Sequence, residues 1–278
     1  MPVARGEEIR FEGSGGLGLS GTLAAGETGD GVLLLHGLTG HRGLVTMGSR
    51  LLEKSGRTTF AWDARGHGVS DAPPDGSGWS YGHLAADALT ALDVAGLVRP
   101  VLVGVSMGAH TAARVALARP DLVGGLVLVT PAFDPEVPLG AAAGRWDRLA
   151  DALERDGLEG FADEVSSAVA DPAVRTTVHR AALQRMAVHR DPRCLITALR
   201  EVPRSRPFGS WAELSGISCP SIVIGSRDET DPTHPLAVAR KWSEVIAGAS
   251  LEVEKKGESP LAWRGAAIAG AAALLASG

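Results

Sequence analysis

The chain has 278 residues and a mass of 28.6 kDa; 45% of its residues are hydrophobic and 21% are charged. This is enough apolar material for a large core, which excludes a chain that is disordered throughout. The net charge of -5 argues against a general nucleic-acid-binding protein, because binding to phosphates needs a basic face. The two cysteines, Cys194 and Cys219, have the spacing of neither a zinc site nor a redox pair, so we expect two reduced thiols.

The amino-terminal segment is charged. Arg5, Glu7 and Glu8 lie where a signal peptide would need apolar residues, and no run of eighteen or more apolar residues follows. The most apolar stretch, residues 265–278, is short and rich in alanine, which suits a packed final helix better than a membrane span. We therefore expect a soluble, cytoplasmic protein that has no membrane or nucleic-acid partner.

Short apolar runs alternate with amphipathic stretches along most of the chain, which is typical of an α/β protein. Buried strands are predicted at residues 31–35, 58–62, 100–105, 122–129 and 221–225. Helices are predicted between them at residues 83–97 and 107–118. Strands joined through helices in this way predict a mainly parallel sheet.

The pattern changes after residue 131. Residues 131 to 217 contain no convincing strand, but apolar residues recur there at helical spacing, as at Trp146, Leu149 and Leu153. Alternating strands and helices resume at residues 221–225, 235–246, 250–253 and 262–275. The sequence therefore predicts one α/β core domain, residues 1–131 and 218–278, with a helical lid inserted over residues 132–217.

A G-x-S-x-G motif, Gly104-Val105-Ser106-Met107-Gly108, follows a predicted strand and opens a predicted helix. That is the context in which a nucleophile elbow occurs. The glycines relieve crowding in a strained turn, which lifts Ser106 Oγ clear of the sheet at the positive end of the helix. Ser106 is therefore the predicted nucleophile.

A second segment, His36-Gly37-Leu38-Thr39-Gly40, ends the first buried strand. With this segment and the G-x-S-x-G motif, the chain resembles the α/β-hydrolase superfamily over nearly its whole length. The resemblance implies an α/β-hydrolase fold and an oxyanion hole formed by the backbone N–H groups of Leu38 and Met107. It also implies that His36 shapes the loop, and we expect His36 and Thr39 to border the substrate.

The resemblance points to a catalytic acid as well. In this superfamily the acid follows the next-to-last strand, and Gly225-Ser226-Arg227-Asp228 matches its G-x-x-D pattern. Asp228 is therefore the orienting carboxylate that the resemblance implies. Asp231 lies three residues further on and competes for the same role.

The catalytic base departs from the family pattern. The family's histidine belongs to a G-H-x-P-like segment after the last strand. Here that segment reads Lys256-Gly257-Glu258-Ser259-Pro260, with Glu258 in the place of the histidine. His234 is the last histidine in the sequence. The usual order of serine, aspartate and histidine therefore cannot be completed in the usual place.

Several explanations stay open for the base. In one, His234, six residues after Asp228, reaches Ser106 from an unusual position. In another, Glu258 is the base and is oriented by Asp228 or Asp231, so that one of two neighbouring carboxyls has a raised pKa. In a third, the elbow is retained without acylation, which leaves a binding protein or pseudoenzyme.

Two other histidines, His110 and His41, are further alternatives for the base. The identity of the base matters because the reference pKa of Glu is about 2 lower than that of His, which makes an unshifted Glu a poorer base. A weak base is tolerable for an activated ester or a thioester, whose leaving group needs no proton, but not for an amide. Slow attack by water would also leave the acyl-enzyme free to meet another nucleophile, which motivates an acyltransferase.

Arginines are concentrated in the second half of the predicted lid. From residue 172 to residue 206 there are eight arginines against two acidic residues, Asp191 and Glu201. Such a field could dock an acidic acyl-carrier protein or the phosphates of coenzyme A, although arginines paired with acidic residues would look the same in the sequence. Trp146 and Met186 are predicted to line an acyl pocket, with Phe161 and Met47 as further possibilities.

The function predicted from the sequence is acyl transfer through an acyl-Ser106 intermediate. The first expectation is an esterase or thioesterase that releases the acyl group to water. The alternatives are an acyltransferase that takes its acyl group from a carrier-protein or coenzyme A thioester, and a non-catalytic small-molecule receptor. No cofactor or metal is predicted, because no cluster of histidine, cysteine and acidic residues has ligand spacing and no G-x-G-x-x-G motif follows a strand.

Overall fold

The structure is a computed structural model. It describes residues 6–74, 76–139, 143–227, 231, 233–256 and 265–276.

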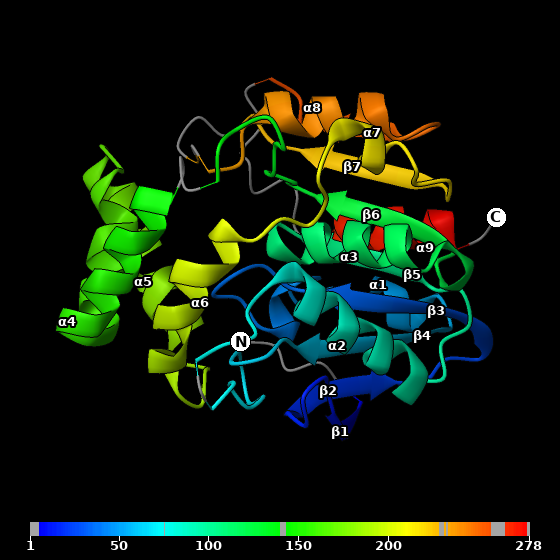
Figure 1. Ribbon diagram of the computed structural model, residues 1–278, viewed down its shortest axis with the longest axis horizontal. Helices are drawn as coiled ribbons and strands as arrows, with labels where there is room; N and C mark the ends of the chain where they lie inside the picture. The colour runs from blue at the N-terminus through cyan, green and yellow to red at the C-terminus, as the bar shows by residue number, and fades with distance from the viewer. Residues whose placement is uncertain are drawn as a thin grey trace.

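The centre of the molecule is an eight-stranded sheet (Figure 1). Its strands are β1 (Glu7–Glu12), β2 (Gly18–Ala24), β3 (Thr28–Leu35), β4 (Arg57–Asp63), β5 (Val101–Val105), β6 (Gly125–Val129), β7 (Ser221–Gly225) and β8 (Ser250–Val253). Their order across the sheet is β1-β2-β4-β3-β5-β6-β7-β8. β2 pairs antiparallel with both β1 and β4, and all the other pairs are parallel. The predicted α/β fold with a mainly parallel sheet is confirmed.

The first two strands, β1 and β2, were not predicted. β1 reads Glu-Glu-Ile-Arg-Phe-Glu and lies at the edge of the sheet, where most of its side chains are exposed. β2 contains two glycines, a serine and a threonine. Neither strand has the continuous apolar run that identifies the buried parallel strands. Charged residues interrupt β1, and glycine, serine and threonine interrupt β2 although four of its successive residues are buried.

Helices cover both faces of the sheet. They are α1 (Leu51–Lys54), α2 (Tyr81–Val94), α3 (Met107–Ala118), α8 (Leu236–Val245) and α9 (Gly265–Leu275). α2, α3 and α8 contribute to one buried apolar cluster, and α1 and α9 contribute to the other. The parallel strands are therefore buried on two sides, which explains their uniformly apolar sequences.

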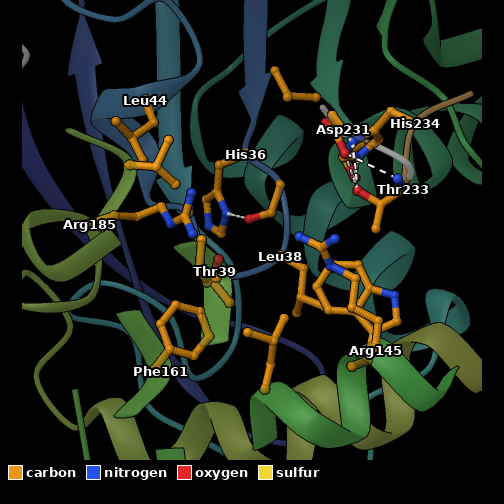
Figure 2. Close-up of a pocket in the computed structure, with 18 of the residues that line it drawn as sticks. His36, Leu38, Thr39, Leu44, Arg145, Phe161, Arg185, Asp231, Thr233 and His234 are labelled. Atoms are coloured by element: carbon orange, nitrogen blue, oxygen red, sulfur yellow. Dashed lines mark hydrogen bonds and ion pairs between the residues drawn. The ribbon is translucent and has the colours of Figure 1, made fainter. Parts of the chain in front are cut away.

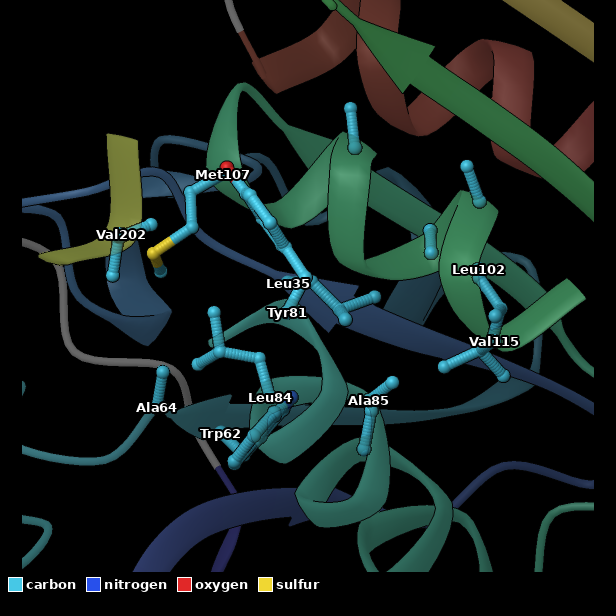
Figure 3. Close-up of a cluster of buried hydrophobic side chains, with 14 of the residues drawn as sticks. Leu35, Trp62, Ala64, Tyr81, Leu84, Ala85, Leu102, Met107, Val115 and Val202 are labelled. Carbon is cyan, nitrogen blue, oxygen red and sulfur yellow. The ribbon is translucent and has the colours of Figure 1, made fainter. Parts of the chain in front are cut away.

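The larger cluster joins β3, β4 and β5 to α2 and α3 (Figure 3). In it, Trp62 from β4, Leu84 from α2 and Leu102 from β5 are at most 2% exposed. Burial of each such side chain is worth about 1.5–3 kcal/mol. Val202, from the segment between β6 and β7, packs into the same cluster. This packing fixes the ends of β3 and β5 side by side, and the site lies there.

The described residues between β6 and β7 are largely helical. They form α4 (Ala143–Ser167), α5 (Pro172–Met186), α6 (Leu195–Glu201) and α7 (Trp211–Leu214), and short 3-10 turns lie before and after α6. Figure 1 shows α4, α5 and α6 at one end of the sheet, apart from the helices that cover its faces. The division of the chain at residues 132 and 217 stays a prediction. Among the described helices, none has both the length and the apolar character needed to cross a membrane.

Candidate active site

Ser106 lies in a sharp turn between β5 and α3. Its φ of 51° and ψ of -112° are unfavourable for a residue with a side chain. The turn also needs two glycines. A Cβ atom on Gly104 would lie 2.2 Å from the carbonyl oxygen of Gly108, and one on Gly108 would lie 2.1 Å from that of Leu35. The strand, strained serine and helix predicted for a nucleophile elbow are therefore present.

A chain of hydrogen bonds leads away from Ser106. The Nε2 atom of His234 is 2.8 Å from Ser106 Oγ, and the Nδ1 atom of His234 is 2.6 Å from Oδ2 of Asp231. A carboxylate can only accept, so Nδ1 carries the proton and donates to Asp231, which leaves Nε2 to accept from the serine hydroxyl. This tautomer lets an imidazole take a proton from a serine.

Asp231 is held as an anion. Burial alone would raise the pKa of its carboxyl, but hydrogen bonds from His234 and Thr233, together with the charge of His234, outweigh that effect and lower the pKa to about 2. Thr233 donates from its backbone N–H, 3.1 Å away, and from its hydroxyl. Asp231 is therefore charged throughout the neutral range and accepts the hydrogen bond from Nδ1 of His234.

The structure thus brings three of the predicted catalytic residues together, Ser106, His234 and Asp231, from two loops at the same edge of the sheet. Asp228 and Glu258 lie outside the described residues, so their predicted roles have no position to be compared with. The sequence favours Asp228 because it completes the G-x-x-D pattern, and that assignment stays a prediction.

The other two histidines considered as bases have different neighbours. His110 accepts hydrogen bonds at Nε2 from the backbone N–H groups of Ala132 and Phe133, and its Nδ1 is 2.8 Å from the hydroxyl of Tyr81. Burial, followed by the charge of His234, lowers the pKa of His110 to about 3. His41 accepts from the N–H of Gly43 as the cap of a 3-10 turn. Both side chains stabilise backbone turns.

The predicted oxyanion donors lie beside Ser106. A Cβ atom on Gly37 would be 3.5 Å from Cβ of Ser106, so the loop after β3 passes directly next to Ser106. Leu38, the next residue of that loop, lines the cavity that contains Ser106. Met107 is the first residue of α3, where backbone N–H groups have no acceptor within the helix. The side chain of Met107 is buried in the core, as Figure 3 shows, and only its backbone is available to a ligand.

Three buried histidines hold the loop that carries Leu38. His36 donates from Nδ1 to the carbonyl of Gly37 and accepts at Nε2 from the N–H of Ala64. His67 accepts at Nε2 from the N–H of Thr39, and His189 donates from Nε2 to the carbonyl of Thr39. The remaining nitrogens of His67 and His189 bind the backbone of the segment after β4.

Each of these three imidazoles has one donor and one acceptor contact, which requires the neutral form. Burial lowers the pKa of His36 and of His67, and it lowers that of His189 to about 4. The three rings lie close together, with centroids 4.9 Å apart for His36 and His67 and 5.7 Å apart for His67 and His189. The roles of His67 and His189 could not be found in the sequence, because their partners are distant along the chain.

A cavity of about 370 Å³ opens beside Ser106, between the sheet and the lid helices (Figure 2). His36, Thr39 and Trp146, which the sequence predicts to contact the substrate, are among its lining residues. The prediction for Met186 is wrong. Its side chain is fully buried in the core, and the preceding residue of α5, Arg185, lines the cavity instead. Adjacent helical residues point in different directions, so one step along the helix separates the two environments.

Several of the predicted lid arginines form ion pairs. Arg204 binds Asp147 at 2.7 Å, and Arg200 binds Asp151 and Glu154 at 2.8 and 2.7 Å. Arg190, after α5, binds Asp71 at 2.6 Å. These pairs partly neutralise the positive field of the lid. A carrier-protein partner at this surface stays a prediction.

Known proteins resemble the chain in sequence. A family model described as alpha/beta hydrolase fold matches residues 31–263. Over 154 residues the chain is 34% identical to the sn-1-specific diacylglycerol lipase ABHD11 of Xenopus laevis, a match that covers 53% of this chain and 48% of that protein. The match to the mouse protein of the same name covers 31% of its length. The chain therefore spans less than half the length of these two curated relatives.

Solved structures resemble the chain over almost all of its length. A hydrolase from Pseudomonas aeruginosa PA01 superposes with a TM-score of 0.78 at 21% identity, covering 99% of this chain and 100% of that chain. An enol-lactonase from Burkholderia xenovorans LB400 superposes with a TM-score of 0.76 at 21% identity, covering 97% of this chain and 100% of that chain. At this level of identity the likeness shows a shared fold.

Proposed function

Because the chain belongs to the α/β-hydrolase fold family, as its resemblance predicted, we propose that it is a serine hydrolase that cleaves an ester through an acyl-Ser106 intermediate. The observation that carries this proposal is the hydrogen-bond chain from Ser106 Oγ through His234 to Asp231. The strained elbow that presents Ser106 and the cavity beside it support the same conclusion.

In the proposed reaction, Nε2 of His234 takes the proton of Ser106 as Oγ attacks the carbonyl carbon of the substrate. The negative charge that develops on the carbonyl oxygen is stabilised by the N–H groups of Leu38 and Met107. His234 then returns the proton to the leaving alcohol. Water, activated by the same nitrogen, attacks the acyl-enzyme and releases the acid, while Asp231 stabilises the imidazolium in both halves of the reaction.

A histidine base favours hydrolysis over transfer to another acceptor. An imidazole beside Ser106 can both accept the proton of the attacking water and protonate the leaving group, so neither half of the reaction is impaired. The similar proteins named a diacylglycerol lipase and an enol-lactonase favour an ester over a thioester as the substrate. Esterase is therefore our first choice, and thioesterase is the second.

Turnover and intact mass together test this proposal. The chain and its Ser106→Ala variant are incubated with a panel of phenyl esters and acyl thioesters, and both product and protein mass are followed. We expect phenyl ester turnover without a lasting adduct, a loss of at least about 10³-fold in Ser106→Ala, and an unchanged Tm in that variant. An adduct on Ser106 that persists for minutes would indicate an acyltransferase, and no reaction with any ester would favour a receptor.

A further inference from the structure

Two arginine side chains extend from the lid helices into the cavity. Arg145 belongs to α4 and Arg185 to α5, and both line the cavity that contains Ser106. Figure 2 shows the Arg185 guanidinium pointing into the cavity beside His36 and Thr39, on the side away from Asp231 and His234. The Arg145 guanidinium lies on the side of Thr233.

Neither guanidinium has a hydrogen bond or ion pair with the described part of the chain. The Nε atom of Arg185 is buried without a hydrogen-bond partner. The lid arginines on the outer surface behave differently, since Arg200 and Arg204 bind acidic residues of α4. Asp231 is the one acidic residue among the described lining residues, and its carboxylate is already occupied by His234 and Thr233.

A buried cation without a counterion is unfavourable in a folded protein. Arginine cannot escape this cost by losing its proton at neutral pH, because its guanidinium stays charged. A site with such a group is completed when a ligand supplies the negative charge. The planar fork of N–H donors matches a carboxylate, which it can bind through two parallel hydrogen bonds.

We propose that Arg185 binds a free carboxylate of the substrate, so that the enzyme acts on esters that carry an acid group away from the scissile carbonyl. This inference rests on the proposed esterase function and adds the class of substrate. The rest of the cavity favours a small ligand with an apolar chain, because Leu149, Phe161 and Val178 are among its lining residues. A volume of about 370 Å³ lies within the usual range for small-molecule sites.

Binding of a simple dicarboxylate tests the site without requiring turnover. Adipate and a neutral counterpart without an ester bond, adipamide, are titrated by calorimetry into the unaltered chain and into Arg185→Gln, Arg185→Lys and Arg180→Gln. Arg180 is the matched control, because it is an exposed arginine of the same helix that does not line the cavity. Circular dichroism and Tm confirm that each variant is folded.

We expect adipate to bind the unaltered chain at least tenfold more tightly than adipamide. Arg185→Gln should weaken adipate binding by at least tenfold, Arg185→Lys should weaken it less, and Arg180→Gln should leave it within twofold. Failure of the unaltered chain to bind adipate, or equal binding by Arg185→Gln, would overturn the proposal. If Arg185→Gln does not fold, Arg185→Lys takes its place. Lysine keeps the positive charge but lacks the planar fork of N–H donors, so Arg185→Lys should still bind adipate more weakly than Arg180→Gln does.

Kinetics separate this inference from the proposed function. Monophenyl adipate and methyl phenyl adipate differ only in the free carboxylate. We expect kcat/KM for the monophenyl ester to be at least tenfold higher than for the methyl phenyl ester. Arg185→Gln should remove most of that difference, whereas Arg180→Gln should retain it. Turnover of both esters without a preference would contradict the carboxylate site and leave the esterase proposal intact. Adipate binding without turnover of either ester would contradict the esterase proposal and leave the carboxylate site intact.

Discussion

Ser106 illustrates how single residues determine this site. Its strained backbone is held because Gly104 and Gly108 let three backbone segments approach where no side chain fits. A left-handed conformation at a residue with a side chain costs about 1–3 kcal/mol, which the surrounding packing has to offset. Because Gly104 and Gly108 have no Cβ atom, the backbone can form the tight turn that exposes Ser106.

A methyl group at Gly108 should therefore disrupt the elbow. In Gly108→Ala the new Cβ would meet the carbonyl oxygen of Leu35 at 2.1 Å, so that α3 and β3 must separate. We expect a fall in Tm of several degrees and a loss of at least about 10²-fold in kcat/KM, measured by thermal unfolding and ester turnover.

Gly270→Ala is the matched control for this substitution. Gly270 lies in α9 and a Cβ atom there meets nothing within 4 Å, so alanine should be neutral or slightly stabilising through its helix propensity. Equal effects of the two substitutions would contradict the explanation of the elbow.

At the scale of elements, the loop after β3 is positioned by histidines from three segments. His36 comes from the loop itself, His67 from the segment after β4, and His189 from the segment after α5. Each imidazole bonds backbone groups that lack a partner in regular structure. The helical segment between β6 and β7 is therefore attached to the loop after β3 by the hydrogen bond of His189 as well as by apolar packing.

This arrangement predicts a loss of stability in acid. The histidines remain neutral in the folded protein, whereas unfolded histidines take up protons below about pH 6.5. Because the folded pKa of His189 is lowered to about 4, the unfolded state binds more protons between these two values. The free energy of unfolding should therefore be highest above about pH 6.5 and fall as the pH decreases toward 4.

Substitution of His189 measures its share of this effect. His189→Gln removes one titrating group, so the decrease in the free energy of unfolding from pH 7 to pH 5 should be smaller than in the unaltered chain by about 2 kcal/mol. Urea unfolding at the two pH values provides the measurement. His83→Gln, a change at an exposed histidine of α2, should retain the original pH dependence; if His189→Gln also retains it, the neutral histidine cluster is not the cause.

At the scale of the whole molecule, the parallel sheet gathers distant residues at one edge. Ser106 follows β5, and His234 is 128 positions later in the loop after β7, yet their side-chain atoms meet at 2.8 Å. Loops after the carboxyl ends of parallel strands converge in this way in α/β folds generally. The lid then closes the space above them and contributes both the apolar wall and the two arginines.

The sequence predicts the parts of this design that depend on local patterns. The buried strands are continuous apolar runs, and Ser106 is recognised because its motif joins a strand to a helix. The antiparallel β1 and β2 are missed because charged residues and glycines interrupt them. Whether Arg185 or Met186 lines the cavity depends on how α5 is rotated about its axis, and that rotation is set by tertiary packing.

The relation between acid and base shows the same limit. The G-x-x-D pattern favours Asp228, which lies outside the described residues, whereas the contact that the structure shows is the one between Asp231 and His234. The contacts of His189 with Gly68 and Thr39 join residues more than a hundred positions apart, and no local pattern predicts them.

In the proposed mechanism His234 activates Ser106, and the rate at which a fluorophosphonate probe labels Ser106 measures that activation. The probe reacts with an activated serine, so the measurement needs no knowledge of the natural substrate. Intact mass is followed with time for the unaltered chain and for Ser106→Ala, His234→Gln and Glu258→Gln. We predict no labelling in Ser106→Ala, a rate lowered by at least about 10²-fold in His234→Gln, and a change of less than threefold in Glu258→Gln. Labelling that survives His234→Gln but is lost in Glu258→Gln would contradict the account.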